Sequence, residues 1–166
     1  MATTASGFTL KTELGDITLQ FRRDAAPETV TYIETLIQQH RLYDGTSFYR
    51  SDFVIQCGTY DGLKLGDRPI NPLDKLHVNE THMHVPVLNT RGTASFAHWD
   101  VPDCGNTEWF INLRCNTHLD TVYGGYCVFA EIIDNASFKV VDAIADVIAS
   151  GKKKTVTITS VVLITT

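Results

Sequence analysis

The chain has 166 residues, of which 43% are hydrophobic and 20% charged, which is typical of one folded domain with a core of ordinary size. Its formal net charge of -5 disfavours nucleic acid and anionic membranes as partners. No stretch approaches transmembrane length, and the N-terminus lacks the features of a signal peptide. We therefore expect one domain over residues 1–166, free cysteine thiols, no membrane partner and a cytoplasmic location.

The first half of the chain predicts two pairs of strands separated by a helix. Apolar and polar residues alternate over residues 8–13 and 17–22, with turn residues between them, which indicates a hairpin with one buried face. Apolar residues recur at helical spacing over residues 27–40, where a proline favours the helix start. Residues 48–50 and 53–56 predict two short strands joined by a tight bend.

The second half of the chain alternates strands with long loops. Irregular segments punctuated by turn residues are expected at residues 59–85, 98–106 and 115–125. Strands are expected at residues 93–97, 108–113, 126–133 and 156–164. A second amphipathic helix is expected at residues 138–148, with Asn135 or Ser137 as its N-terminal cap.

The order of these elements predicts a mostly β fold. The two helices lie far apart in the sequence, so the chain lacks the regular strand–helix alternation of a parallel sheet. About eight short strands can close into an antiparallel barrel without exposed edges. We therefore expect a closed eight-stranded antiparallel β-barrel capped by two α-helices, each burying one face.

Arg50 and Gln56 are polar residues in an otherwise apolar stretch. Because an arginine is almost never fully buried without a partner, Arg50 either pairs with an acid such as Asp52 or lines an apolar site that needs one fixed donor. Motifs for nucleotide binding and for a serine or cysteine nucleophile are absent. His82 and His84 lack further ligands at a suitable spacing, so no metal and no cofactor are expected.

The residues alone leave the function open. A peptide-binding or small-ligand-binding barrel fits these features as well as an enzyme does. A carrier of small molecules would need an open lumen, whereas the apolar share of this chain, 43%, predicts a filled one.

Three stretches resemble the motifs of the cyclophilins, a family of peptidyl-prolyl cis-trans isomerases. Phe48-Tyr49-Arg50 is similar to F-H-R, residues 53–58 to F-M-x-Q-G-G, and Trp109-Phe110-Ile111 to the end of Q-F-F-I. The order and spacing match over nearly the whole chain. The resemblance implies the capped barrel and an isomerase that acts on X-Pro bonds of proline-containing peptides or proteins. The alternative is a binding module of the same fold that docks proline segments without turnover.

The resemblance also implies residue roles. Arg50 falls on the catalytic arginine of the family, and Phe53, Phe110 and Leu119 fall on the walls of its proline pocket. The full set of implied substrate-binding residues is Phe53, Val54, Gln56, Ala97, His98, Glu108, Phe110, His118, Leu119 and Tyr126.

The chain departs from the family pattern at several of these positions. The connection from Arg50 to Phe53 is shorter than in the family motif, and Val54 replaces a methionine. His98, Glu108 and Tyr126 stand where the family usually has Asn, Gln and His, respectively. His118 falls where many members have a tryptophan that hydrogen-bonds cyclosporin, so weak binding of that drug is expected. A monomer is expected, because nothing in the sequence requires a partner subunit.

Overall fold

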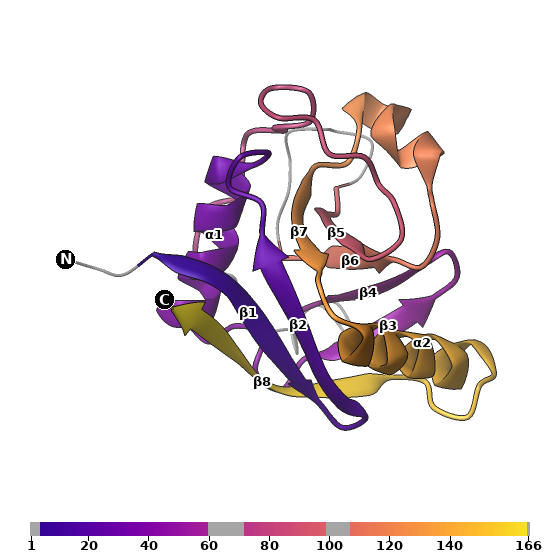
Figure 1. The fold of residues 1–166 in the computed structure, drawn as a ribbon. Coiled ribbons are helices and arrows are strands. Elements are labelled where there is room, and N and C mark those ends of the chain that lie inside the picture. Colours follow the sequence, from indigo (N-terminus) through magenta and orange to yellow (C-terminus); the bar gives the residue numbers. More distant parts are fainter. Residues whose placement is uncertain (1–3, 60–71, 99–106, 166) are drawn as a thin grey trace.

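The computed structural model describes residues 4–59, 72–98 and 107–165. Within these ranges, eight antiparallel strands close into a barrel in the order β1-β2-β7-β5-β6-β4-β3-β8 (Figure 1). The strands are β1 (Ala5–Thr12), β2 (Gly15–Phe21), β3 (Ser47–Ser51), β4 (Val54–Gly58), β5 (Thr93–Phe96), β6 (Trp109–Asn112), β7 (Val128–Ile132) and β8 (Val156–Thr165). The predicted fold is confirmed.

Two helices lie at different ends of the barrel (Figure 1). Helix α1 (Pro27–Gln38) buries Val30, Ile33 and Leu36 as predicted, and it ends two residues earlier than expected. Helix α2 (Asn135–Ala149) begins before the predicted start, and its cap was predicted wrongly. Asp134 is the cap, because its carboxylate accepts a hydrogen bond of 2.7 Å from the Ser137 backbone N–H.

Aromatic side chains fill the barrel interior. Trp109 is 1% exposed, and its ring contacts Phe8, Phe48 and Phe129 edge-on at centroid distances of 5.8, 6.3 and 5.7 Å. Edge-to-face contacts of this kind stabilise a core beyond the simple burial of area. The filled interior argues against a carrier barrel, which would need an open lumen.

Tyr49 lies at a β-bulge that decides which face of the barrel Arg50 occupies. Phe48 pairs with Cys57 and Arg50 pairs with Gln56, so β3 advances two residues where β4 advances one. In a regular strand Phe48 and Arg50 would point to the same face. The bulge instead leaves Phe48 fully buried in the core and places Arg50 on the outer face, beside Gln56.

One loop differs from prediction, and two others lie partly outside the described residues. The segment expected to be irregular over residues 115–125 contains two short 3-10 helices, η2 (Thr117–Asp120) and η3 (Val122–Gly124). Most of the loop predicted at residues 98–106, and residues 60–71 of the loop predicted at residues 59–85, lie outside the described residues.

His82 and His84, which the sequence places two residues apart, have separate partners. His82 Nε2 is 3.0 Å from the carbonyl oxygen of Asp120, and His84 Nε2 is 3.2 Å from the buried carboxylate of Glu80. Nowhere in the three described ranges do three His, Cys, Asp or Glu side chains gather as metal ligands. The same ranges contain no helix long and apolar enough to cross a membrane.

Candidate active site

Strand register places three of the predicted site residues in one row across the outer face of the barrel. Gln56 of β4 is paired with Arg50 of β3 on one side and with Phe110 of β6 on the other. Paired residues of neighbouring strands lie about 5 Å apart and point to the same face. Residues far apart in the sequence therefore become neighbours through strand pairing alone.

A second apolar cluster, separate from the barrel core, lies beside this row. We call it the outer cluster. Val54, Phe110 and Leu119 are its buried members, between 2% and 7% exposed. Phe53, Ala97 and Tyr126 are half-buried and pack against them. All six residues belong to the set assigned from sequence to substrate binding, so the structure brings that part of the predicted site together.

The Arg50 guanidinium lies at the edge of the outer cluster and is held from three directions. Its Nε donates to Asp52 Oδ2 over 2.8 Å, and its Nη1 donates to Gln56 Oε1 over 3.0 Å. Its Cζ lies 5.4 Å from the centroid of the Phe53 ring, a distance typical of a cation–π contact. Gln56 is fixed in turn, because its Nε2 donates to Tyr49 Oη over 2.8 Å.

The position of Arg50 is compatible with both roles that the sequence allowed, an ion pair with Asp52 and a place in the lining of an apolar site. Its side chain is 42% exposed, so it is neither enclosed in the interior nor fully solvated. The contact with Asp52, expected if Arg50 were merely structural, coexists with the contacts to Gln56 and Phe53 that the site requires. The guanidinium keeps N–H groups available for a ligand, since an arginine has five.

Buried amide side chains, which sequence reasoning missed, fix the walls of the site. Asn116 Nδ2 donates to the Phe53 carbonyl oxygen over 3.0 Å, and Leu113 N–H donates to the same oxygen over 3.1 Å. Asp120, at the end of η2, accepts from the backbone and side-chain nitrogens of Asn89 at 2.8 and 2.9 Å. These bonds hold the Phe53 turn and the Leu119 segment in register with the barrel.

His98, His118 and Tyr126 form the rim of the outer cluster. The His98 ring stacks on Tyr126 with a centroid distance of 4.1 Å and an angle of 10°. The exposed His118 ring lies edge-on to Phe53 at 5.2 Å, so it covers one side of the ring that Arg50 contacts on another. Rim residues of this kind contact a ligand without enclosing it.

Glu108 is half-buried at the end of β6, where Gly58 makes room for it. A Cβ atom on Gly58 would lie 2.6 Å from the Glu108 carboxyl group, so a larger residue at this position would displace the side chain. Glu108 Oε2 accepts a hydrogen bond of 2.7 Å from Thr107 Oγ1. Its negative charge also acts on Tyr49, which places the carboxylate near the row of site residues.

Burial keeps the ionisable hydroxyls and one thiol of this region neutral. It raises the pKa of Tyr49 well above its ordinary value, with Glu108 acting in the same direction. It also raises the pKa of Tyr126, an effect that nearby Arg50 opposes. The pKa of the Cys127 thiol rises to about 12 for the same reason. At neutral pH Tyr49 and Tyr126, which both interact with Arg50, are therefore uncharged.

Comparison with known proteins decides the family. Residues 7–163 match the family model described as "Cyclophilin type peptidyl-prolyl cis-trans isomerase/CLD". The chain belongs to this family. Its members isomerise X-Pro peptide bonds, so this cyclophilin is a peptidyl-prolyl cis-trans isomerase that acts on proline-containing peptides or proteins.

Curated relatives and solved structures agree with that assignment. Peptidyl-prolyl cis-trans isomerase B of Escherichia coli is 34% identical over 154 residues, which cover 87% of this chain and 86% of the relative. A peptidyl-prolyl cis-trans isomerase of Acinetobacter baylyi is 30% identical over 83% of this chain and 71% of its own length. The crystal structure of a Cryptosporidium parvum cyclophilin has a TM-score of 0.73 at 19% identity, covering 98% of this chain and 99% of its own.

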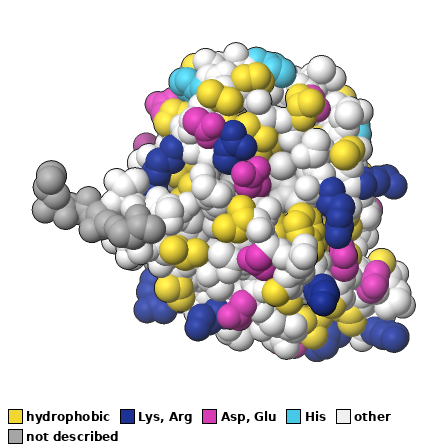
Figure 2. Space-filling view, viewed as in Figure 1, with side chains coloured by type: hydrophobic (Ala, Val, Ile, Leu, Met, Phe, Trp, Pro, Cys, Tyr) yellow, Lys and Arg dark blue, Asp and Glu magenta, His cyan; other side chains and the backbone are white. Residues whose placement is uncertain are grey.

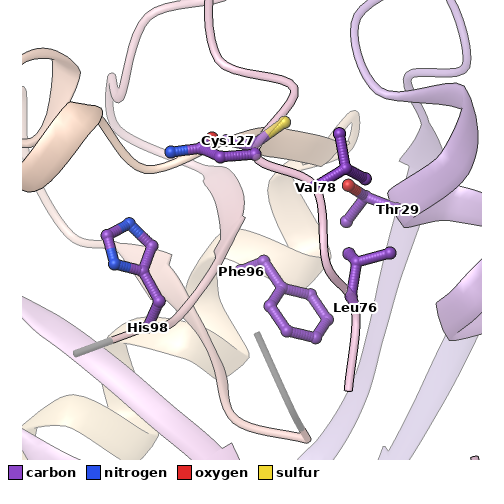
Figure 3. Close-up of a pocket in the computed structure, with 7 residues that line it drawn as sticks. Thr29, Leu76, Val78, Phe96, His98 and Cys127 are labelled. Carbon is purple, nitrogen blue, oxygen red and sulfur yellow. The ribbon is translucent and has the colours of Figure 1, made fainter. Parts of the chain in front are cut away.

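His98 of this cyclophilin also lines a hollow that the sequence did not predict (Figure 3). It is a small hollow that is partly open to solvent. Leu76, Val78, Phe96 and Cys127 give it a mainly apolar lining. The residues that form it come from four separate segments, so no local sequence pattern could have indicated it.

Proposed function

We propose that Arg50 is the catalytic residue and that it acts by donating a hydrogen bond to the proline nitrogen as the X-Pro bond rotates. Resonance across the C–N bond sets a barrier of about 18–20 kcal/mol and keeps the nitrogen lone pair delocalised in the planar states. In the twisted state the lone pair is localised on nitrogen and accepts a hydrogen bond well. A donor at that nitrogen therefore stabilises the transition state more than the ground states.

The observation that carries this proposal is the position of the Arg50 guanidinium. It contacts the face of Phe53 and is held by Gln56 at the edge of the outer cluster, which offers an apolar surface to a pyrrolidine ring. A charged donor at the edge of such a surface acts in a partly dehydrated medium, where its field is stronger than in water. Rotation breaks no covalent bond, so the reaction requires neither a nucleophile nor a metal.

We assign the other predicted residues to substrate binding according to their positions. Phe53, Phe110 and Leu119 would contact the proline ring, with Val54 beneath them and Ala97 and Tyr126 at the side. His98, Glu108 and His118 would contact residues on either side of the proline. Gln56 would orient Arg50 and leave the guanidinium free to approach the nitrogen.

Exchange NMR on an Ala-Pro test peptide separates an enzyme from a module that only binds. With the protein well below the peptide concentration, we expect exchange cross-peaks between the cis and trans forms that are absent without protein. Line broadening without such cross-peaks would mean binding without turnover and would overturn the proposal.

We also propose that cyclosporin binds this protein weakly. His118 is exposed and lies edge-on to Phe53, and its imidazole is a smaller apolar surface than an indole. A ligand that gains contact area and a hydrogen bond from a tryptophan at this place would lose part of both.

Finally, we propose that the protein is a cytoplasmic monomer that has no nucleic-acid or membrane partner. In support, Cys57, Cys115 and Cys127 of the described chain are free thiols, as in proteins of reducing compartments. The net charge is -5, and acidic and basic side chains are interspersed on the face seen in Figure 2. Light scattering would test the mass, and cell fractionation would test the location.

A further inference from the structure

We propose that Asp52 is a positioning residue for the reaction: its carboxylate holds the Arg50 guanidinium in the orientation from which it donates to the substrate. This inference rests on the catalytic role proposed above for Arg50. Asp52 itself need not touch the substrate.

The geometry of the strand end brings the two charges together. Arg50 lies next to the last residue of β3, and Asp52 is the first residue of the bend that follows, so the turn of the chain carries the Asp52 side chain back towards Arg50. The resulting contact joins Arg50 Nε to Asp52 Oδ2 over 2.8 Å. A second Arg-x-Asp pair follows the end of β2, where Arg22 Nε donates to Asp24 Oδ1 over 2.9 Å.

The bend between β3 and β4 fixes the Asp52 carboxylate before it binds Arg50. Strand β3 ends at Ser51 and β4 begins at Val54, so only Asp52 and Phe53 join the strands. Asp52 N–H donates to the Val54 carbonyl oxygen over 3.0 Å, and Asp52 Oδ1 accepts from Val54 N–H over 3.2 Å. One carboxylate oxygen therefore anchors the side chain to the backbone, and the other is directed at Arg50.

Different nitrogens of the Arg50 guanidinium bind Asp52 and Gln56, and this leaves one nitrogen for a substrate. Asp52 engages Nε and Gln56 engages Nη1, and these bonds fix both the plane and the rotation of the guanidinium. Within the described residues Nη2 has no hydrogen-bond partner, so its N–H groups are available for a substrate. A planar donor held at two of its nitrogens loses little freedom when the third binds.

The Arg50–Asp52 ion pair is too exposed to contribute much to the stability of the fold. The Arg50 and Asp52 side chains are 42% and 43% exposed, and ion pairs this exposed are strongly screened by water. Positioning of a catalytic group is more sensitive, because a small displacement of a donor from its target slows the reaction markedly.

Asp52→Asn tests the proposal, with Asp24→Asn as the matched control. The Asn amide oxygen can still accept from Val54 N–H, but its NH2 group would face the Arg50 Nε donor. Exchange NMR should show the catalysed rate at saturating Ala-Pro peptide falling roughly three- to tenfold in Asp52→Asn. The dissociation constant of the peptide should stay within about twofold of wild type, since the outer cluster is intact. Asp24→Asn should change neither quantity.

Two further measurements distinguish positioning from damage to the fold. The urea midpoint of Asp52→Asn should differ from wild type no more than that of Asp24→Asn does. The Arg50 Nε–Hε resonance should move in Asp52→Asn and stay in place in Asp24→Asn, because only the first variant loses the carboxylate bonded to that proton. Asp52→Ser, which retains an oxygen acceptor for the turn, should reproduce the loss of rate.

A wild-type or faster rate in Asp52→Asn would overturn the proposal, as would an equal loss in Asp24→Asn. A parallel loss of rate and peptide affinity would also overturn it, because it would show that Asp52 shapes the binding surface. If the wild-type protein itself catalysed no exchange, the proposed function would fail first, and this inference would fail with it.

Discussion

The two faces of strands β3, β4 and β6 both carry aromatic and aliphatic side chains, but polar residues join them on the outer face only. The inner-face residues are Phe48, Ile55, Cys57, Trp109 and Ile111, all of them in the barrel core. The outer-face residues are Arg50, Val54, Gln56 and Phe110, which belong to the row and the outer cluster of the proposed active site. Each strand thus supplies both faces by simple alternation, apart from the bulge at Tyr49.

The difference lies in what surrounds each aromatic ring. Trp109 is enclosed by rings from other strands, whereas Phe110 packs in the outer cluster, in the same row as half-exposed Arg50. Burial on the inner face therefore stabilises the fold, whereas on the outer face the half-buried Phe53, Ala97 and Tyr126 retain apolar surface that a substrate can cover. Neighbouring residues of one strand should then respond differently to the same substitution.

The largest expected effect is on stability at the inner face. Trp109→Ala should lower the free energy of unfolding by about 3–5 kcal/mol, because it leaves a cavity among rings that cannot collapse. Phe110→Ala should cost less than half as much, since its neighbours lie at an open site. Urea unfolding of the two variants measures both values. Equal losses would show that the outer cluster is part of the structural core.

The second largest expected effect is a loss of peptide affinity at the outer face. Phe110→Ala should weaken binding of a proline peptide by about 10- to 100-fold, because a buried aromatic side chain contributes roughly 1.5–3 kcal/mol. NMR titration gives the dissociation constant, and Tyr32→Phe, remote from the row, serves as a control. An unchanged dissociation constant would remove Phe110 from the substrate site.

A smaller effect, a gain in cyclosporin affinity, is expected at the rim residue His118. His118→Trp should tighten cyclosporin binding by roughly five- to tenfold, since the indole adds apolar area and a donor. Calorimetric titration of wild type and variant gives the two affinities. Wild-type affinity in the variant would show that the ring at this position does not determine the response to the drug.

The smallest expected effect is a loss of catalysed rate when the hydrogen bond between Tyr49 and Gln56, the residue that holds Arg50, is removed. Tyr49→Phe removes the Oη that accepts from Gln56 Nε2, so the catalysed rate should fall roughly two- to fivefold, the value of one neutral hydrogen bond. Peptide affinity and the urea midpoint should hardly change. A rate loss as large as that of an Arg50 variant would mean that Tyr49 has a more direct part.

Much of the fold was predictable from local patterns in the sequence. Alternation over β1 and β2 and the helical spacing of Val30, Ile33 and Leu36 depend only on neighbouring residues, and the structure has both. The wrong cap of α2 is an error of the same local kind. Asp134 precedes the expected start, and helix boundaries are less sharply encoded than helix faces.

The site was predictable only in part, because it depends on register and long-range contacts. The motifs located Arg50, Gln56 and Phe110, and the structure places them in one row. The bulge at Tyr49 has no sequence signal, since it appears only when β3 is aligned against β4. The bond from Asn116 to the Phe53 carbonyl oxygen joins residues 63 positions apart, which no local pattern reveals.

The most direct test of the account is a combined measurement of peptide affinity and catalysed exchange in Arg50→Ala. The account predicts that the exchange rate at saturating peptide falls at least about tenfold, because one selective charged hydrogen bond is worth ~1.5–3 kcal/mol, while the dissociation constant stays within about threefold of wild type. Exchange at the wild-type rate, or a loss explained wholly by weaker binding, would contradict the claim that Arg50 stabilises the twisted amide.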